Sequence, residues 1–252
     1  MGRPVILETQ NLTHIFPDGT VGVEGVSLQV YEGDFVIIAG ANGSGKTVLT
    51  RHLNGLLVPS NGQVLFDGEL INKNIVKSRR NIGLIFQDSE SQFVGQTVFE
   101  EVAFGPENLN LPRDEVDEVV RNTLEAVGLG DFMTCNPYTL SGGQKRKLAV
   151  AGVLAMRPKV IMFDEPFTGL DYPGVIQVLK QLVQLHEAGH TIILITHELE
   201  KVLAHGNRLI VMHKGKVVDD GAPEEVIHNV EDYGVRMPLK SGEGVGALSW
   251  LK

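Results

Sequence analysis

The sequence contains a single cysteine, and no hydrophobic run in it is long enough to cross a bilayer. One cysteine, Cys135, excludes an internal disulfide, which is typical of a protein that works in a reducing compartment. A membrane-spanning helix needs about 18 or more apolar residues, so we expect any contact with a membrane to depend on a partner protein. The N-terminal segment MGRPVILETQ lacks the apolar core of a secretory signal peptide. These absences predict a cytoplasmic location.

Positive charge is also scarce in this chain. Lysine and arginine number 22 against 31 aspartate and glutamate residues, which leaves a net charge of -9. Such an acidic chain is a poor candidate for binding nucleic acid by charge alone, and we expect no nucleic-acid partner. Its 252 residues and hydrophobic content of 42% are ordinary for a globular protein with a sizeable core.

Short apolar segments recur along the chain, and each is continuous rather than alternating, as expected of strands buried on both faces. They are FVIIAG (35–40), IGLIFQ (82–87), VIMFDE (160–165), TIILIT (191–196) and LIVM (209–212). The segments that we predict to be helical are 46–56, 113–128, 142–156, 174–188 and 198–205. This alternation predicts an α/β fold with a mostly parallel central sheet.

Two other parts of the chain depart from this alternation. VILETQNL (5–12), VEGVSLQV (23–30) and QVLFDG (63–68) are typical of antiparallel strands joined by turns. Residues from about 90 to 156 contain few strand signals, and we predict that they form an inserted helical subdomain. We place the whole domain at 1–240 and expect 241–252, which is rich in glycine and serine, to be a flexible tail.

The segment GANGSGKT (40–47) follows the first apolar strand and precedes a predicted helix. Glycines let the main chain approach phosphate oxygens closely, and the loop N–H groups with the helix N-terminus supply positive potential. Lys46 is expected to reach the β- and γ-phosphates of a nucleotide, and Thr47 to hold Mg²⁺. The residues expected to contact the nucleotide here are Gly40, Ala41, Asn42, Gly43, Ser44, Gly45, Lys46, Thr47 and Val48.

Carboxylates end the strand VIMFDE. Asp164 stands at the strand tip, where its oxygens suit a hard ion such as Mg²⁺. Glu165 follows and is expected to orient, or accept a proton from, a water molecule that attacks the γ-phosphate. Acidic residues are also common at exposed strand ends, so it is the combination with the phosphate loop that favours a functional interpretation.

Three further side chains are candidates because of where they stand in the chain. His197 follows the apolar strand TIILIT, which we expect to lie beside the strand ending at Asp164. Gln87 ends IGLIFQ, and its amide could touch both Mg²⁺ and the attacking water. Phe16 could stack on an adenine ring through its π face, although a core phenylalanine at a hairpin is an equally open interpretation.

The segment LSGGQ (140–144) contains no acid, no aromatic group and no lysine at phosphate-loop spacing. Ser141 is a good N-cap, and Gly142 and Gly143 expose N–H groups at the start of a predicted helix. The segment therefore predicts an anion-binding surface that lacks a cation of its own.

The ordered set of GANGSGKT, Gln87, LSGGQ, VIMFDE, TGLD (168–171) and His197 resembles the ATP-binding cassette (ABC) ATPases, and the likeness covers nearly the whole chain. The resemblance implies a P-loop NTPase fold that uses ATP and Mg²⁺. It also implies a head-to-tail dimer, in which Ser141, Gly142, Gly143 and Gln144 close the ATP site of a second ATPase subunit, either a copy of this chain or a related one. Asp171 would lie in the loop that crosses the dimer interface.

The segment DSESQFVGQTVFEEVAFGPENLNLP (88–112) resembles most closely the energy-coupling-factor group of ABC ATPases, which includes cobalt, nickel, biotin and other vitamin importers. In that group this region grips a helix of an integral membrane subunit, which would hold the protein at the cytoplasmic face of the membrane. A helical cap with an acidic face is the alternative interpretation of the same residues.

The chain departs from the family pattern at Phe167, where a small residue is usual, and at Phe16, where tyrosine is common. Neither change affects the expected catalytic set of Lys46, Gln87, Glu165 and His197. The alternative function is that of an ABC ATPase in DNA repair or translation. Those relatives usually carry coiled coils, zinc modules or tandem cassettes, and this sequence shows none of these.

Overall fold

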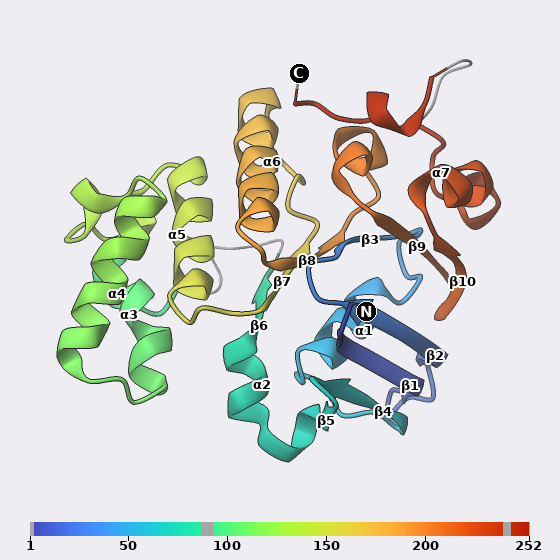
Figure 1. Cartoon of the computed structure of the whole chain (residues 1–252), viewed down its shortest axis with the longest axis horizontal. Helices are drawn as coiled ribbons and strands as arrows, with labels where there is room; N and C mark the ends of the chain where they lie inside the picture. Colours follow the sequence, from blue (N-terminus) through green and yellow to red (C-terminus); the bar gives the residue numbers. More distant parts are fainter. Residues whose placement is uncertain (1–2, 87–92, 239–242, 252) are drawn as a thin grey trace.

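The computed structural model of the chain describes residues 3–86, 93–238 and 243–251 (Figure 1). Its centre is a six-stranded sheet with the order β10-β9-β3-β8-β7-β6. The strands are β3 (Phe35–Ala39), β6 (Ile82–Ile85), β7 (Val160–Asp164), β8 (Thr191–Ile195), β9 (Arg208–His213) and β10 (Lys216–Gly221). All neighbours pair in parallel except β10 with β9, so the predicted mostly parallel sheet is confirmed.

The central sheet is buried on both faces, which explains its continuous apolar segments. Alternate residues of β3 enter different cores: Phe35 and Ile37 pack with the helices, whereas Val36 and Ile38 pack on the side of the first helix and the N-terminal sheet. Because side chains alternate along a strand, a strand covered on both faces must be apolar throughout. Every residue of β3, β7 and β8 is accordingly buried.

The predicted antiparallel N-terminal unit is a separate four-stranded sheet with the order β2-β1-β4-β5. Its strands are β1 (Val5–Ile15), β2 (Val21–Tyr31), β4 (Asn61–Phe66) and β5 (Glu69–Leu70). In β2 the burial alternates along the strand, as it does when one face is covered and the other is exposed. Figure 1 shows this sheet on one side of the central sheet and α6 on the other.

The α-helices are spread along the chain between Lys46 and Val226. They are α1 (Lys46–Leu53), α2 (Ile75–Asn81), α3 (Val98–Asn108), α4 (Arg113–Ala126), α5 (Gly142–Leu154), α6 (Tyr172–Glu187) and α7 (Pro223–Val226). Short 3₁₀ segments are η1 (Ile71–Asn74), η3 (Gly130–Phe132), η4 (Pro137–Thr139), η5 (Leu199–Lys201), η6 (Leu203–His205), η7 (Ile227–Tyr233) and η8 (Val245–Ala247). Figure 1 shows α3, α4 and α5 side by side as a helical layer beyond β6.

The predicted helix over 198–205 is wrong. The structure has two 3₁₀ turns there, η5 and η6, which are separated by Val202 at φ -139. A β-branched residue favours such an extended φ, and a helix cannot continue through it. The sequence analysis also assigned no element to α2 or to β10, whose pattern of partly buried and exposed positions lacks the continuous apolar character of the other central strands.

The C-terminal residues also differ from the expectation of a loosely held tail. Val245 and Leu248 are buried, and the N–H of Ala204 donates a hydrogen bond of 3.0 Å to the carbonyl oxygen of Leu248. The N–H of Trp250 donates to the carbonyl oxygen of Lys201 at 3.1 Å. These few apolar anchors hold the described tail residues, 243–251, despite the glycine-rich composition.

Candidate functional site

The loop from Gly40 to Gly45 joins the end of β3 to the start of α1. Gly40, Gly43 and Gly45 all have positive φ angles, of 155°, 78° and 102°. A Cβ on Gly40 would lie 2.4 Å from the carbonyl oxygen of Met212, and one on Gly45 would lie 2.6 Å from that of Gly22. Both separations are shorter than atoms tolerate, so glycine is required for the loop to pass between β9 and β2.

Lys46 begins α1 and is only 7% exposed. Its Nζ donates hydrogen bonds to the carbonyl oxygens of Gly40 at 2.7 Å and Ala41 at 3.0 Å. Burial lowers the pKa of Lys46, while the nearby carboxylates of Glu165 and Asp164 act in the opposite direction. The lysine is thus held above its own loop by carbonyl groups that a phosphate could replace.

Ser44 supports the fit of this loop to an anion. Its Oγ is buried and has no hydrogen-bond partner among the described residues. A buried hydroxyl without a partner costs free energy, and a phosphate oxygen would satisfy it. The loop N–H groups at the N-terminus of α1 add a favourable dipole for the same ligand.

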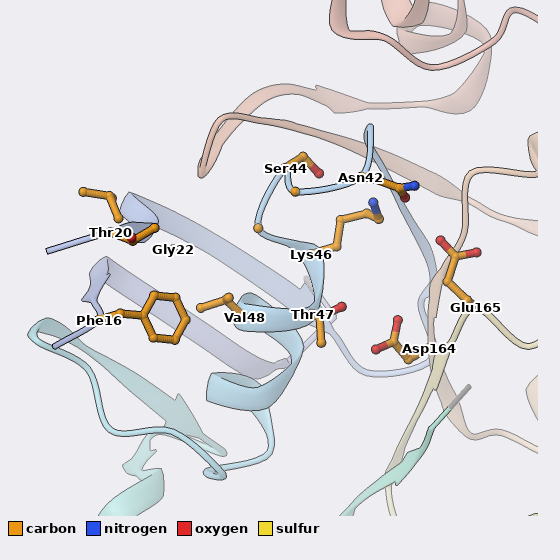
Figure 2. A pocket seen from close by; sticks show the side chains of 13 residues that line it. Phe16, Thr20, Gly22, Asn42, Ser44, Lys46, Thr47, Val48, Asp164 and Glu165 are labelled. Carbon is orange, nitrogen blue, oxygen red and sulfur yellow. The ribbon is translucent and has the colours of Figure 1, made fainter. Parts of the chain in front are cut away.

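A pocket of about 360 Å³ opens over this loop. It is lined by Phe16, Thr20, Val21, Gly22, Asn42, Gly43, Ser44, Gly45, Lys46, Thr47, Val48, Asp164 and Glu165. Figure 2 shows Phe16 and Val48 toward one end of the pocket, and Lys46, Asp164 and Glu165 toward the other. An apolar end and a charged end suit a ligand that has a base at one end and phosphates at the other.

Phe16 follows β1, and its ring is held in place by its neighbours. A Cβ on Gly22 would lie 2.9 Å from Phe16 Cε2, so the ring occupies space that this glycine leaves free. The ring of His14 packs edge-on against Phe16 with centroids 4.6 Å apart. Gly22 was not among the predicted site residues, and no local motif indicates it.

Asp164 is the last residue of β7 and is 8% exposed. Burial raises its pKa, as does the neighbouring charge of Glu165, while a hydrogen bond with Thr47 and the charge of Lys46 lower it. A divalent cation would stabilise the ionised carboxylate. The described residues contain no cluster of three or more histidine, cysteine or acidic side chains suited to a metal. The hydroxyl of Thr47 and the carboxylate of Asp164 could therefore supply only part of a coordination shell. That arrangement fits Mg²⁺, which keeps waters and phosphate oxygens as ligands.

Glu165 and His197 lie side by side because β7 and β8 are paired in register. Asp164 is opposite Ile195, and the N–H of Glu165 donates to the carbonyl oxygen of Ile195 at 2.9 Å. His197 Nδ1 and Glu165 Oε1 are 3.0 Å apart, within hydrogen-bond distance. Glu165 has a positive φ of 49°, which is uncommon for a residue with a side chain. Its Oε2 is buried without a partner among the described residues, so one carboxylate oxygen remains to accept a further hydrogen bond.

The segment LSGGQ starts α5 and does not line this pocket. Ser141 is the N-cap of the helix, in a capping box with Gln144: the N–H of Ser141 donates to Gln144 Oε1 at 2.9 Å. A Cβ on Gly142 would meet nothing within 4 Å, so open space lies in front of the helix N-terminus. The structure therefore brings together the loop, Phe16, Asp164, Glu165 and His197, but not Ser141–Gln144. Gln87 lies outside the described residues.

One contact ties α5 to the segment that follows Glu165. Arg146 donates a hydrogen bond from Nη2 to the carbonyl oxygen of Thr168 at 3.2 Å, and burial lowers the pKa of its guanidinium. Asp171, four residues after Phe167, caps α6 by accepting a hydrogen bond from the N–H of Gly174 at 3.0 Å. The sequence analysis did not identify Arg146, because an arginine within a helix carries no signal of its tertiary partner.

A sequence model of the family described as ABC transporter matches residues 23–168, which is more than half of the chain. The chain belongs to the ABC transporter ATP-binding family. This ABC ATPase is 43% identical over 229 residues to the energy-coupling factor transporter ATP-binding protein EcfA of Methanocaldococcus jannaschii, a match that covers 90% of this chain and 82% of that protein.

Solved structures agree with this assignment. cbiO1 from Clostridium perfringens, described as part of the ABC transporter complex cbiONQ, has a TM-score of 0.81 and 37% identity, covering 93% of this chain and 96% of that one. The ADP conformation of MJ1267, an ATP-binding cassette of an ABC transporter, has a TM-score of 0.79 and 29% identity, covering 92% and 96%. The P-loop ABC ATPase fold expected from the motifs is confirmed, and the chain is an ATPase. None of the helices in the described ranges is long and apolar enough to cross a membrane.

Proposed function

We propose that this ABC ATPase hydrolyses ATP in complex with Mg²⁺ and thereby drives an importer of the energy-coupling-factor type. The observation that carries the proposal is the pair Glu165 and His197, held 3.0 Å apart beside the loop that carries Lys46. The identity of 43% to a protein named EcfA supports the transporter class. Relatives named as transporter proteins, together with the net charge of -9, do not favour the alternative of DNA repair or translation.

The roles of the residues follow from their positions. Lys46 Nζ exchanges the carbonyl oxygens of Gly40 and Ala41 for the β- and γ-phosphate oxygens, while Thr47 and Asp164 hold Mg²⁺. When bound, Mg²⁺ neutralises charge on the phosphate oxygens. The ring of Phe16 stacks on the adenine at the apolar end of the pocket.

The chemical step depends on Glu165. Its free Oε2 accepts a hydrogen bond from the attacking water, while Oε1 is oriented by His197. Lys46 and the loop N–H groups stabilise the negative charge that develops on the phosphate oxygens. Gln87 is assigned contacts with Mg²⁺ and the same water on the basis of its motif.

A second ATPase subunit completes the site. Ser141–Gln144 present an uncovered helix N-terminus with no cation in it, which suits the γ-phosphate of a nucleotide held by Lys46 of a facing subunit. That subunit is a second copy of this chain or a related ATPase. Closure of the pair around ATP, and opening after hydrolysis, supply the movement.

Membrane subunits convert that movement into transport. We assign their contact to the segment 88–112, which contains α3 (Val98–Asn108), and this contact holds the ATPase at the cytoplasmic face of the membrane. The cargo class that the motif likeness supports is a metal ion such as cobalt or nickel, or a vitamin such as biotin.

Replacing Glu165 by glutamine tests the chemical assignment. We expect Glu165→Gln to bind ATP and form the closed pair but to hydrolyse ATP on the order of 10²- to 10³-fold more slowly, since a positioned base contributes rate factors of that size. Nucleotide binding and steady-state hydrolysis are measured on the same preparation. Glu187→Gln at the exposed end of α6 is the matched control and should retain full activity. Near-normal hydrolysis by Glu165→Gln would remove Glu165 from this role.

Isolation of the tagged chain from its source tests the transporter class. We expect it to co-purify from detergent-solubilised membranes with polytopic membrane proteins. Recovery only in a soluble complex with nucleic acid or ribosomes would favour the alternative function.

A further inference from the structure

A buried lysine lies close to two aromatic rings outside the candidate active site. Lys201 is 6% exposed, and its Nζ is 4.9 Å from the ring centroid of Trp250 and 5.7 Å from that of Phe167. Both separations are within the range of cation–π attraction. The ring of Tyr172 lies 5.3 Å from that of Trp250. We call Phe167, Tyr172, Lys201 and Trp250 the Lys201 stack.

Three of the four members of the stack lie in segments that follow residues of the expected site. Phe167 follows Glu165 by two positions, Lys201 follows His197 by four, and Tyr172 follows Asp171 directly. Trp250 comes from the C-terminal tail, which Figure 1 shows ending beside α6. The stack therefore joins the segments that begin at the hydrogen-bonded pair Glu165 and His197.

Packing alone does not account for a charged residue at this place. Lys201 pairs with Glu198, whose Oε2 is buried without a partner among the described residues. Burying an ammonium group and a carboxylate costs free energy that an apolar side chain would avoid. The rings of Trp250 and Phe167 offset part of this cost only when they lie over the charge, so the cation fixes where both rings stand.

We infer that Trp250 is a positioning residue for ATP hydrolysis: through Lys201 and Phe167 it sets the relative position of the segments that carry Glu165 and His197. The inference rests on the proposed function and adds the C-terminal tail to the hydrolysis machinery. Trp250 is not among the residues that line the nucleotide pocket, so its removal should change the rate of hydrolysis more than the binding of ATP.

The same coupling must act in the reverse direction. If Trp250 biases the position of the two segments, a nucleotide that moves those segments must change the surroundings of Trp250. Trp250 is the only tryptophan of the chain, so its fluorescence reports on the stack without any added label.

The kinetic test compares three variants of the full chain. We expect Trp250→Ala to lower kcat for ATP about fivefold, with KM changed less than about twofold, a rate effect of the size that one lost cation–π contact can produce. Trp250→Phe retains an aromatic face and should recover at least half of the rate. Tyr31→Ala removes a ring from another cation–π pair, with Arg3 in the N-terminal sheet, and should leave kcat unchanged.

A loss of thermal stability in Trp250→Ala with kcat unchanged would show that the ring is only packing, and would overturn the inference. Equal loss of rate in Trp250→Ala and Trp250→Phe would also overturn it, because the aromatic face would then not be what matters.

The tryptophan fluorescence of the Glu165→Gln variant, which retains Trp250, supplies a second test if Trp250→Ala does not fold. We expect ATP with Mg²⁺ to shift its tryptophan emission, and an emission spectrum unchanged at saturating ATP would overturn the inference. The proposed function fails on a different result, namely absence of ATP hydrolysis by the unmutated chain.

Discussion

The chain contains two glycine-rich segments at helix N-termini, and they differ in how much of a phosphate site each provides. The loop 40–45 is enclosed by backbone from β2 and β9 and ends in a buried Lys46, with Asp164 and Glu165 in the same pocket. In the segment 140–144, Ser141 and Gly142 are exposed, open space lies in front of Gly142, and no residue is a cation. A helix N-terminus therefore has the walls and the charge of an anion pocket at the loop 40–45, whereas the segment 140–144 offers only N–H groups on an open surface.

The largest expected effect comes from the enclosed segment. Lys46→Met keeps the aliphatic stem but removes the only cation among the described residues that line the pocket. We expect ATP affinity to fall at least about 10-fold and turnover on the order of 10³-fold, because electrostatic stabilisation of the phosphate oxygens is lost. Equilibrium binding of ATP and steady-state hydrolysis measure both. Lys180→Met, at an exposed position of α6, is the control, and retention of ATP turnover by Lys46→Met would contradict the comparison.

A substitution in the segment 140–144 should reduce ATP turnover without reducing ATP binding by the isolated chain. Gly143→Asp places a carboxylate where the γ-phosphate of the facing subunit is expected, so repulsion should reduce turnover on the order of 10²-fold. The isolated chain should still bind ATP, because Gly143 does not line the pocket, and an acidic residue in the first turn does not weaken a helix. Gly244→Asp in the tail, where a Cβ would meet nothing within 4 Å, is the control.

Mixing the two inactive variants sharpens this prediction. A heterodimer of Lys46→Met and Gly143→Asp has one intact site and one doubly damaged site. Random pairing should therefore restore roughly a quarter of the activity if two copies of this chain face each other. Absence of recovery would identify the facing subunit as a different chain, and loss of ATP binding by isolated Gly143→Asp would contradict its assignment to the facing site.

The smallest expected effect is on the free energy of unfolding. It concerns α1, the helix that follows the loop 40–45, and not α5. His52 on α1 is fully buried, and burial, with the neighbouring His14, lowers its pKa to about 4. The unfolded chain therefore binds a proton between pH 6.5 and 4 that the folded chain does not, so the free energy of unfolding should fall by about 3 kcal/mol as the pH drops through this window.

His52→Leu removes the group that titrates and should flatten this part of the pH profile. Chemical denaturation at several pH values measures the slope, with His228→Leu in η7, an exposed position, as the control. An unchanged slope in His52→Leu would show that other groups cause the acid sensitivity.

Local pattern was sufficient for the parts of the fold that are covered on both faces and for the glycine-rich loop between β3 and α1. The segment FVIIAG had to be a central strand because each of its side chains enters one of two cores. The parallel neighbours β7 and β8 could be expected to bring His197 near Glu165, although the bond between them depends on a register that sequence does not specify.

Contacts between distant residues were not predictable in the same way. Lys201, Phe167 and Trp250 are far apart in the sequence, and each alone has an ordinary local environment. The short apolar anchors of the tail, such as Leu248, were hidden by surrounding glycines, and Val202 interrupts what the composition of 198–205 presents as a helix.

The hydrogen bond from Arg146 to Thr168 has a consequence for timing. It fastens α5, which would cover a neighbour's nucleotide, to the strand-to-helix connection that begins at this chain's own Glu165. A displacement of α5 is therefore transmitted to Thr168, and the reverse, because both residues belong to packed parts of the chain. In a dimer, the position of Glu165 in each protomer would therefore depend on whether the nucleotide covered by that protomer's α5 is still bound.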